Sequence, residues 1–224
     1  MRFLHVISSV DAAGGGPIEG ATQLHRALSA QGHAGEFASM DDPGSACVQA
    51  FHAAPLHALG PARGRFGYGA RLKPWLRANS DRFDAVIVNG LWQYIGLGTR
   101  RALAGTATPY FVFPHGMLDP WFKRRYPLKH LKKWLYWPWA EYRVLRDATR
   151  VLFTCDEERL LARQSFWLYR CQEAIVSFGT AAPDDDSAVS REAFYAAFPH
   201  LRDKRLLLYL GRIHSKKGCD LLIE

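Results

Sequence analysis

The sequence predicts an α/β fold in which a parallel β-sheet is covered by helices on both faces. Short, continuously apolar runs alternate with helix-like stretches along most of the 224 residues, as expected for strands buried on both faces of a sheet. Most of these runs end in Gly, Asn, His or Thr. The predicted strands are 3–7, 35–38, 85–88, 110–113, 151–153 and 174–176.

Helices are expected between these strands. The first follows a glycine-rich turn and presents one apolar face until it ends at Gly32. Its apolar face consists of Ala21, Leu24 and Leu28. Two later helices are expected, one that ends near Leu103 and one over 157–164. The stretch 41–69 is rich in Ala, Gly, Pro and His and is predicted to be mostly loop.

We expect three regions along the chain. Residues 1–183 form the sheet domain, and 184–204, which begin acidic and loop-like, form a linker region. Residues 205–224 hold the first strand and the start of a helix of a second, truncated α/β domain. A single strand and part of a helix cannot bury their own apolar faces. More of this second domain is therefore expected after Glu224.

The composition, with 48% hydrophobic and 22% charged residues, is that of an ordinary folded protein. The four cysteines are scattered without a CxxC pair, which argues against a zinc site or a disulfide framework and favours free thiols in a reducing compartment. The first residues turn polar too soon for a signal peptide, and no apolar run is long enough to cross a bilayer. We therefore expect a cytoplasmic protein.

Polar residues and glycines gather where the predicted strands end. Asn89, His115, Thr154 and Gly179 each follow a strand closely, and the turn Gly14-Gly15-Gly16-Pro17 follows the first one. Ligands of parallel sheets bind beyond the carboxyl ends of the strands. The sequence therefore predicts a binding site along this edge.

The glycine turn can bind a phosphate, because the backbone N–H groups of Gly15 and Gly16 open a helix. A tight turn without a ligand is the alternative. The spacing matches neither GxGxxG nor GxxxxGK[ST], which argues against a nicotinamide enzyme and against an ordinary kinase or ATPase.

Two further positions are candidates for contact with a substrate. His115 follows a strand directly and can contact a sugar hydroxyl or stabilise charge on a leaving group; the alternative is a structural histidine. Arg212 and Lys217 lie in a turn between a predicted strand and a helix, where a diphosphate can bind. Surface charges without a ligand are the alternative there.

The segment 121–146 carries eight basic residues and one acidic residue, and so nearly all of the net charge of +8. Aromatic residues are interleaved with these charges, which suits a peripheral contact with an anionic membrane. The alternative is a solvated helix whose aromatic residues lie in the core. No nucleic-acid-binding motif accompanies the charge, so no nucleic acid partner is predicted.

No metal or cofactor is predicted. The run Asp184-Asp185-Asp186 resembles a DxD metal site, but it lies in a Pro-Asp-Ser stretch that no strand positions. We interpret it as a solvated acidic loop.

Taken in order, these motifs resemble family 4 of the retaining glycosyltransferases, which have the GT-B fold. The resemblance covers almost the whole chain. It rests on the glycine turn, 115–121 (HGMLDPW), 153–158 (FTCDEE), 178–180 (FGT) and 211–224 (GRIHSKKGCDLLIE). Within this family, the chain resembles glycosyltransferases of the exopolysaccharide type.

The resemblance implies two Rossmann-like domains that face each other across a cleft, the first mostly for the acceptor and the second mostly for the nucleotide sugar. It implies no bound metal, because cationic side chains and helix amino termini hold the leaving diphosphate. By position, Gly15 and Gly16 would approach the donor, and His115 would lie beside the reacting sugar. The resemblance further implies that Arg212 and Lys217 hold the diphosphate. It implies that Asn89 and Thr154 line the acceptor side. The family's E-x7-E element lies beyond this chain's end.

The leading hypothesis is a retaining hexosyltransferase that moves a sugar from a nucleotide-diphosphate donor to a polysaccharide or lipid-linked acceptor. We expect it in the cytoplasm and peripherally on the inner face of the membrane. The alternative is a non-catalytic fragment of such an enzyme that binds the acceptor or the membrane.

Overall fold

The computed structural model describes residues 1–177, 179, 187–211, 213–214 and 216–223. The chain forms two compact units, Met1–Thr180 and Ala181–Glu224. The sequence prediction put the end of the sheet domain a few residues later, at 183.

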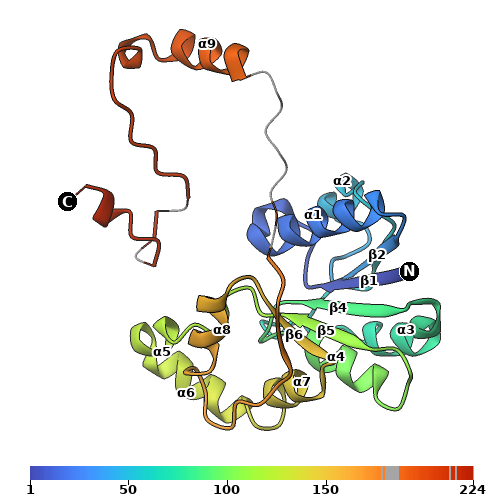
Figure 1. Ribbon diagram of the computed structural model, residues 1–224. Helices are drawn as coiled ribbons and strands as arrows, with labels where there is room; N and C mark the ends of the chain where they lie inside the picture. Colours follow the sequence, from blue (N-terminus) through green and yellow to red (C-terminus); the bar gives the residue numbers. More distant parts are fainter. Residues whose placement is uncertain (178, 180–186, 212, 215, 224) are drawn as a thin grey trace. The chain divides into compact units, whose positions relative to one another are not determined.

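The first unit contains a seven-stranded sheet in which every neighbouring pair of strands is parallel (Figure 1). The strands follow the order β3-β2-β1-β4-β5-β6-β7 across the sheet. Their bounds are β1 (Arg2–Ile7), β2 (Ala34–Ser39), β3 (Leu56–Ala58), β4 (Ala85–Asn89), β5 (Tyr110–Phe113), β6 (Arg150–Phe153) and β7 (Glu173–Ile175). The predicted parallel sheet is confirmed.

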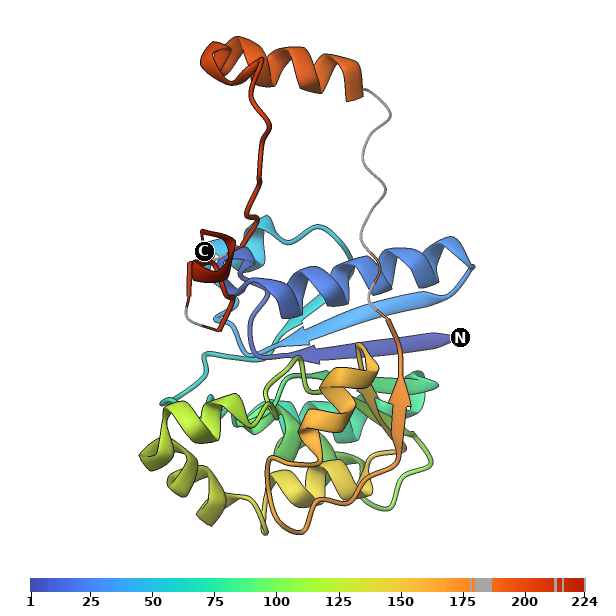
Figure 2. The same cartoon turned by 60° about the vertical axis from the view of Figure 1, so that its left-hand side comes forward.

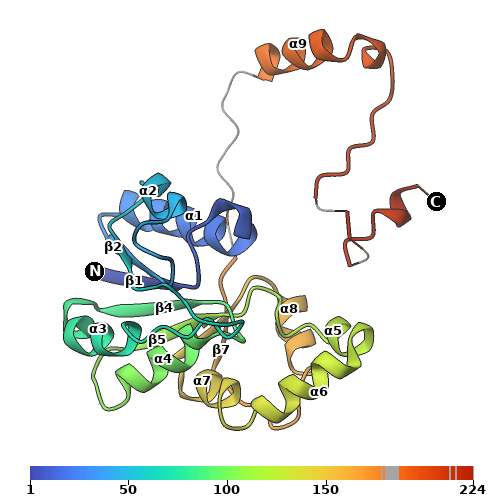
Figure 3. The same ribbon diagram turned by 180° about the vertical axis from the view of Figure 1, so that it is seen from behind.

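Helices cover both faces of this sheet. The helices α1 (Gly16–Ala30) and α2 (Ala46–Ala50) lie on one face, and α3 (Leu72–Asn79), α4 (Tyr94–Leu103) and α7 (Glu141–Asp147) lie on the other (Figures 1 and 2). The helix α8 (Asp156–Ala162) packs against β6 and β7. The helices α5 (Trp121–Arg125) and α6 (Pro127–Tyr136) lie at the end of the sheet where the strands finish, opposite to α3 (Figure 3). Short 3-10 turns are η1 (Ala12–Gly14) and η2 (Ser80–Arg82).

The two faces of the sheet bury different side chains, because neighbouring residues of a strand point to opposite faces. In β1, Leu4 and Val6 belong to the main core shared with α3, α4 and α7. Phe3 and Ile7 pack toward α1. His5 lies between them on the α1 face and is fully buried, which is unusual for a histidine.

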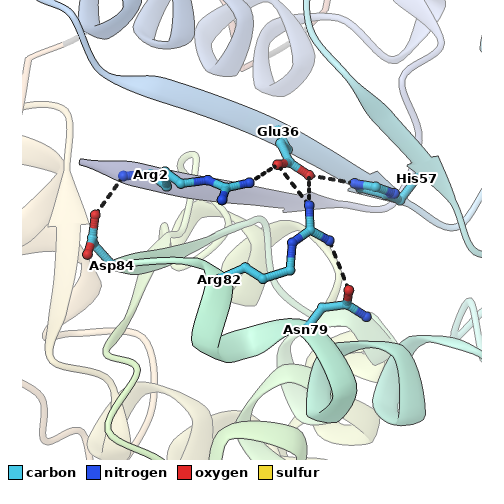
Figure 4. A network of polar contacts seen from close by, with 6 residues as sticks. All are labelled: Arg2, Glu36, His57, Asn79, Arg82 and Asp84. Atoms are coloured by element: carbon cyan, nitrogen blue, oxygen red, sulfur yellow. Dashed lines mark hydrogen bonds and ion pairs between the residues drawn. The ribbon is translucent and has the colours of Figure 1, made fainter.

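A polar network joins the strands on the α3 side of the first unit (Figure 4). The carboxylate of Glu36 accepts hydrogen bonds from Arg2 at 3.0 Å and Arg82 at 3.2 Å, and it lies 2.7 Å from Nε2 of His57. Arg82 also donates to Asn79. Burial alone would raise the pKa of Glu36, but the hydrogen bonds from His57 and Arg2 hold it below the ordinary value. Glu36 therefore stays ionised and links β1, β2 and β3 to η2.

The stretch 41–69 is more regular than the sequence predicted, because it contains α2 and the edge strand β3. Leu56 of β3 pairs with Phe37 of β2. Leu56, Val48 and Phe51 pack on the cluster around Phe37 and Ile18. Such short elements have too few residues for periodicity to reveal them, and contacts with the rest of the fold stabilise them.

In the second unit the structure differs from the sequence prediction. The helix α9 (Ser187–Ala197) occupies much of the predicted linker, followed by η3 (Pro199–Leu201). The predicted buried strand that starts at residue 205 does not form; Leu208 is 84% exposed and Leu210 93%. A strand needs a hydrogen-bonded neighbour, and none of the described residues of this unit pairs with it. Where the helix start was predicted, the described residues form the 3-10 turn η4 (Asp220–Leu222).

Among the described residues, no helix has both the length and the apolar character that a membrane span requires.

Candidate functional site

The glycine turn connects β1 to α1 through η1. Gly15 is the N-cap of α1, with φ of 77° and ψ of −140°, a conformation that a residue with a Cβ rarely adopts. Gly15 and Gly16 are exposed, and a Cβ at either would meet no atom within 4 Å. No side chain caps the first amides of α1. The N–H of Gly15 itself donates to the carbonyl of Ala12 at 3.1 Å, and Pro17 has no N–H. An anion that binds at this helix amino terminus would therefore use the N–H of Gly16.

Asp41, just beyond the end of β2, fixes the loop that leads to this turn. Its two carboxylate oxygens accept hydrogen bonds from Ser9 Oγ at 2.6 Å and from the backbone N–H of Val10 at 2.9 Å. Asp11 in turn accepts from the N–H of Ala13 at 2.9 Å. Sequence reasoning did not single out Asp41, because nothing in its own neighbourhood shows that β2 ends beside β1.

A row of polar groups runs from the interior of the sheet to its carboxyl edge, where His5 and Asn89 are buried and His115 is partly buried. Nδ2 of Asn89, the last residue of β4, lies 3.3 Å from Nδ1 of His5 on β1. Its Oδ1 lies 3.3 Å from Nε2 of His115, which follows β5. The ring of His115 stacks on Phe113 with centroids 5.6 Å apart. The predicted site residues Asn89 and His115 are therefore in direct contact, and Asn89 is buried with 3% exposure.

Both histidines of this row are neutral at pH 7. Burial lowers the pKa of His115 to about 4, and the charge of Glu158 opposes this shift. Burial lowers the pKa of His5 to about 3, and the nearby His25 and His115 lower it further. His115 can therefore exchange hydrogen bonds with a ligand without carrying a positive charge.

Glu158, in the first turn of α8, joins the ends of β5 and β6. It accepts hydrogen bonds from the N–H of Gly116 at 2.6 Å, from the N–H of Thr154 at 2.8 Å and from Thr154 Oγ1 at 2.7 Å. Thr154 is thus brought to the same edge as His115. His115 and Gly116 both have positive φ, 51° and 72°, so this turn needs such support. The resemblance included Glu158 in a motif, but its role follows only from these contacts.

Replacing Glu158 with glutamine is expected to lower the free energy of unfolding by about 1–3 kcal/mol, because one amide oxygen cannot accept from all three donors and a partly buried N–H group loses its acceptor. Urea unfolding measures this loss, and faster hydrogen exchange at Gly116 and Thr154 would locate it. The matched control is Glu157→Gln, since Glu157 is an exposed neighbour on the same helix. Equal stability of the two variants would contradict the role assigned to Glu158.

A second buried group lies next to this edge. Glu141 of α7 is fully buried and accepts the backbone N–H of Trp92 at 2.9 Å, while its Oε2 has no hydrogen-bond partner among the described residues. Trp92 has a positive φ of 69°, and its indole N–H donates to the carbonyl of Met117 at 3.2 Å. Burial raises the pKa of Glu141 to about 8. Glu141 thus holds the loop after β4 against the loop that contains His115.

Two other predicted site residues, Arg212 and Lys217, belong to the second unit of the chain. Lys217 is an exposed residue of the second unit, where its backbone N–H donates to His214 at 2.7 Å. Arg212 lies outside the described residues, as does the run 184–186 that was interpreted as an acidic loop. Within the described part of the chain, no three His, Cys, Asp or Glu side chains are grouped in a way that could hold a metal ion.

A wholly parallel sheet covered on both faces, with polar groups along its carboxyl edge, defines a Rossmann-like domain of the kind found in GT-B glycosyltransferases. A comparison with protein-family models identifies the group more closely. The model described as "Glycosyl transferase 4-like domain" matches residues 15–176, and the chain belongs to this family. No protein of a curated collection matches the sequence.

A solved structure, HepE, shares the fold at low sequence identity, and others resemble this chain more weakly. HepE from Anabaena in complex with UDP-glucose is 13% identical, with a TM-score of 0.58 over 88% of this chain and 50% of that chain. The same protein in complex with UDP and glucose is 14% identical, with a TM-score of 0.58 over 88% and 51%. MurG from Acinetobacter baumannii is 13% identical, with a TM-score of 0.48 over 79% and 44%. This chain therefore spans about half the length of these solved structures.

Proposed function

We propose that this chain is the acceptor-side half of a retaining hexosyltransferase, which moves a sugar from a nucleotide-diphosphate sugar to a saccharide or lipid-linked acceptor. The observation that carries the proposal is the contact between Asn89 and His115 at the edge where parallel sheets bind ligands. Membership of the family supports the reaction class. The UDP-glucose named for HepE supports a nucleotide sugar as the donor.

In this proposal His115 lies beside the reacting sugar. Its neutral ring can hydrogen-bond a sugar hydroxyl, while Asn89 fixes the ring and Thr154 lines the acceptor side. The turn at Gly15 and Gly16 is proposed to approach the donor phosphates, with the N–H of Gly16 as the donor, because the N–H of Gly15 is paired with Ala12. Arg212 and Lys217 are proposed to hold the diphosphate, whose negative charge grows as the sugar leaves.

Transfer is tested by incubating the chain with a panel of nucleotide-diphosphate sugars and saccharide or lipid-linked acceptors. The readouts are release of the nucleotide diphosphate and the anomeric configuration of the product. His115→Ala is expected to slow transfer by about a hundredfold or more. The exposed His52 supplies the matched control, His52→Gln. Transfer at the wild-type rate by a folded His115→Ala variant would contradict the role of His115.

The second candidate is a non-catalytic fragment that binds the acceptor or a membrane. The observation in its favour is that the chain covers only 50% of the solved HepE chain. Calorimetry distinguishes the two candidates. Heat from acceptor binding, with none from any donor and no transfer, would favour the fragment.

We also propose that the protein works in the cytoplasm and peripherally on the inner face of the membrane. The scattered free cysteines Cys47, Cys155, Cys171 and Cys219 support a reducing compartment. The basic, aromatic segment 121–146 supports contact with the membrane.

A further inference from the structure

The helix α6 is amphipathic in the reverse sense, because its apolar side faces away from the protein. Leu128, Leu131 and Leu135 are 83%, 57% and 63% exposed, and Trp134 is 41% exposed. The residues of α6 that are partly buried are His130, Lys133 and Tyr136. A surface helix of a globular protein normally buries its leucines and exposes its lysines. An external apolar partner would restore the usual arrangement.

Contacts of the inward side chains fix this orientation of α6. The ring of His130 stacks on Phe166 with centroids 4.5 Å apart, and Tyr136 meets Phe66 edge to face at 5.4 Å. Lys133 Nζ lies 4.3 Å from the centre of the Trp92 ring. Three inward positions along the helix are thus engaged with the body of the first unit, so the leucines are held outward.

The surface around these leucines is strongly basic. The helices α5 and α6 contain six basic residues and no acidic one. The basic residues are Lys123, Arg124, Arg125, Lys129, Lys132 and Lys133. All of them except Lys133 are exposed. An external partner of α6 must therefore be apolar at its centre and negatively charged around it.

A groove continues this surface toward the candidate site. It has a volume of about 490 Å³, and its lining combines aromatic side chains with Lys132 and Lys133. The exposed Leu135 and Trp139 belong to this lining, and so does Trp92. Since Trp92 donates to the carbonyl of Met117, two residues after His115, the groove shares a wall with the loop of the candidate site.

We propose that the outward face of α6 docks on an anionic lipid bilayer, with Leu128, Leu131 and Leu135 among the acyl chains and the basic residues at the lipid phosphates. A bilayer supplies both an apolar interior and a negatively charged surface. A second copy of this chain fits less well, because the same face would bring two sets of cations together. The proposal extends the lipid-linked acceptor proposed above but does not require transfer.

Vesicle flotation tests the proposal. The chain is mixed with vesicles of phosphatidylcholine alone, or of equal parts phosphatidylcholine and phosphatidylglycerol. It is expected to bind the second kind only, and less strongly as salt is added. The double variant Leu131→Gln/Leu135→Gln is expected to bind at least about tenfold more weakly, because two side chains no longer enter the apolar layer. Lys132→Gln should weaken binding about fivefold.

The matched control is Leu160→Gln on α8, because Leu160 is an exposed leucine of a helix whose first turn is acidic. Circular dichroism checks that each variant is folded. We expect all of them to fold, because the replaced side chains are exposed. Equal binding to both vesicles, absence of binding, or undiminished binding by the double variant would each overturn the proposal. So would a dimer in sedimentation velocity that the double variant dissociates. Transfer is assayed separately with a detergent-dispersed acceptor, so its failure can be told from failure of docking.

Discussion

Replacing Glu141 with glutamine is expected to raise the free energy of unfolding by roughly 4 kcal/mol at pH 8 and by less than about 1 kcal/mol at pH 5. The carboxyl group is fully buried, and burial raises its pKa from 4.5 to about 8. The folded chain therefore keeps a proton that the unfolded chain releases above pH 4.5, so stability falls as the pH rises from 4.5 to 8. A glutamine titrates nowhere in this range, and its carbonyl oxygen can still accept the N–H of Trp92.

Urea unfolding at pH 5, pH 7 and pH 8 measures the difference in unfolding free energy between the wild-type protein and the Glu141→Gln variant. Glu141→Ala is the informative second variant, because it leaves the Trp92 N–H without an acceptor and opens a cavity. It should destabilise the chain at pH 5, where Glu141→Gln changes little. If Glu141→Gln raises the free energy of unfolding by the same amount at all three pH values, then Glu141 does not titrate as a buried acid.

The sequence predicts most of the sheet because its strands are buried on both faces. Continuous apolar runs such as 85–88 and 110–113 match β4 and β5 to within one residue. The short strand β3 and the helix α3 were not predicted. Each depends on contacts with distant residues, as when Leu56 pairs with Phe37.

The carboxyl edge of the sheet was predictable for a topological reason. Any residue that directly follows a buried parallel strand lies at this edge, so Asn89, His115 and Thr154 could be grouped before their contacts were known. The hydrogen bonds that hold the loops around these residues in place could not be predicted. Glu158 and Glu141 act through hydrogen bonds to residues 42 and 49 positions away in the chain, and no local pattern encodes such distances.

The basic segment shows a different limit of sequence reasoning. The leucines of α6 form a helical stripe, which normally indicates a face turned to the core. The structure turns this stripe outward, because the aromatic contacts of His130 and Tyr136 and the position of Lys133 over Trp92 fix the opposite side of the helix. Periodicity identifies a face but cannot say which way it points.

Lowering the pH from 7 to 5 is expected to destabilise the Glu141→Gln variant by about 2 kcal/mol through His5 alone. Burial, with repulsion from His25 and His115, lowers the pKa of His5 from 6.5 to about 3. The unfolded chain therefore takes up a proton below pH 6.5 that the folded chain refuses, and stability is lost as the pH falls. The lowered pKa of His115 acts in the same direction. The Glu141→Gln background is needed because Glu141 titrates with the opposite sign.

Adding His5→Leu to the Glu141→Gln variant should remove about 2 kcal/mol of the stability that is lost between pH 7 and pH 5. This holds however much the substitution changes the free energy of unfolding at pH 7. The relevant quantity is the change in unfolding free energy between the two pH values, measured with urea for both chains. His52→Gln, which removes an exposed imidazole, is the matched control. If His5→Leu leaves the pH dependence unchanged, then His5 accepts a proton in the folded state, and the row from His5 through Asn89 to His115 must open in acid.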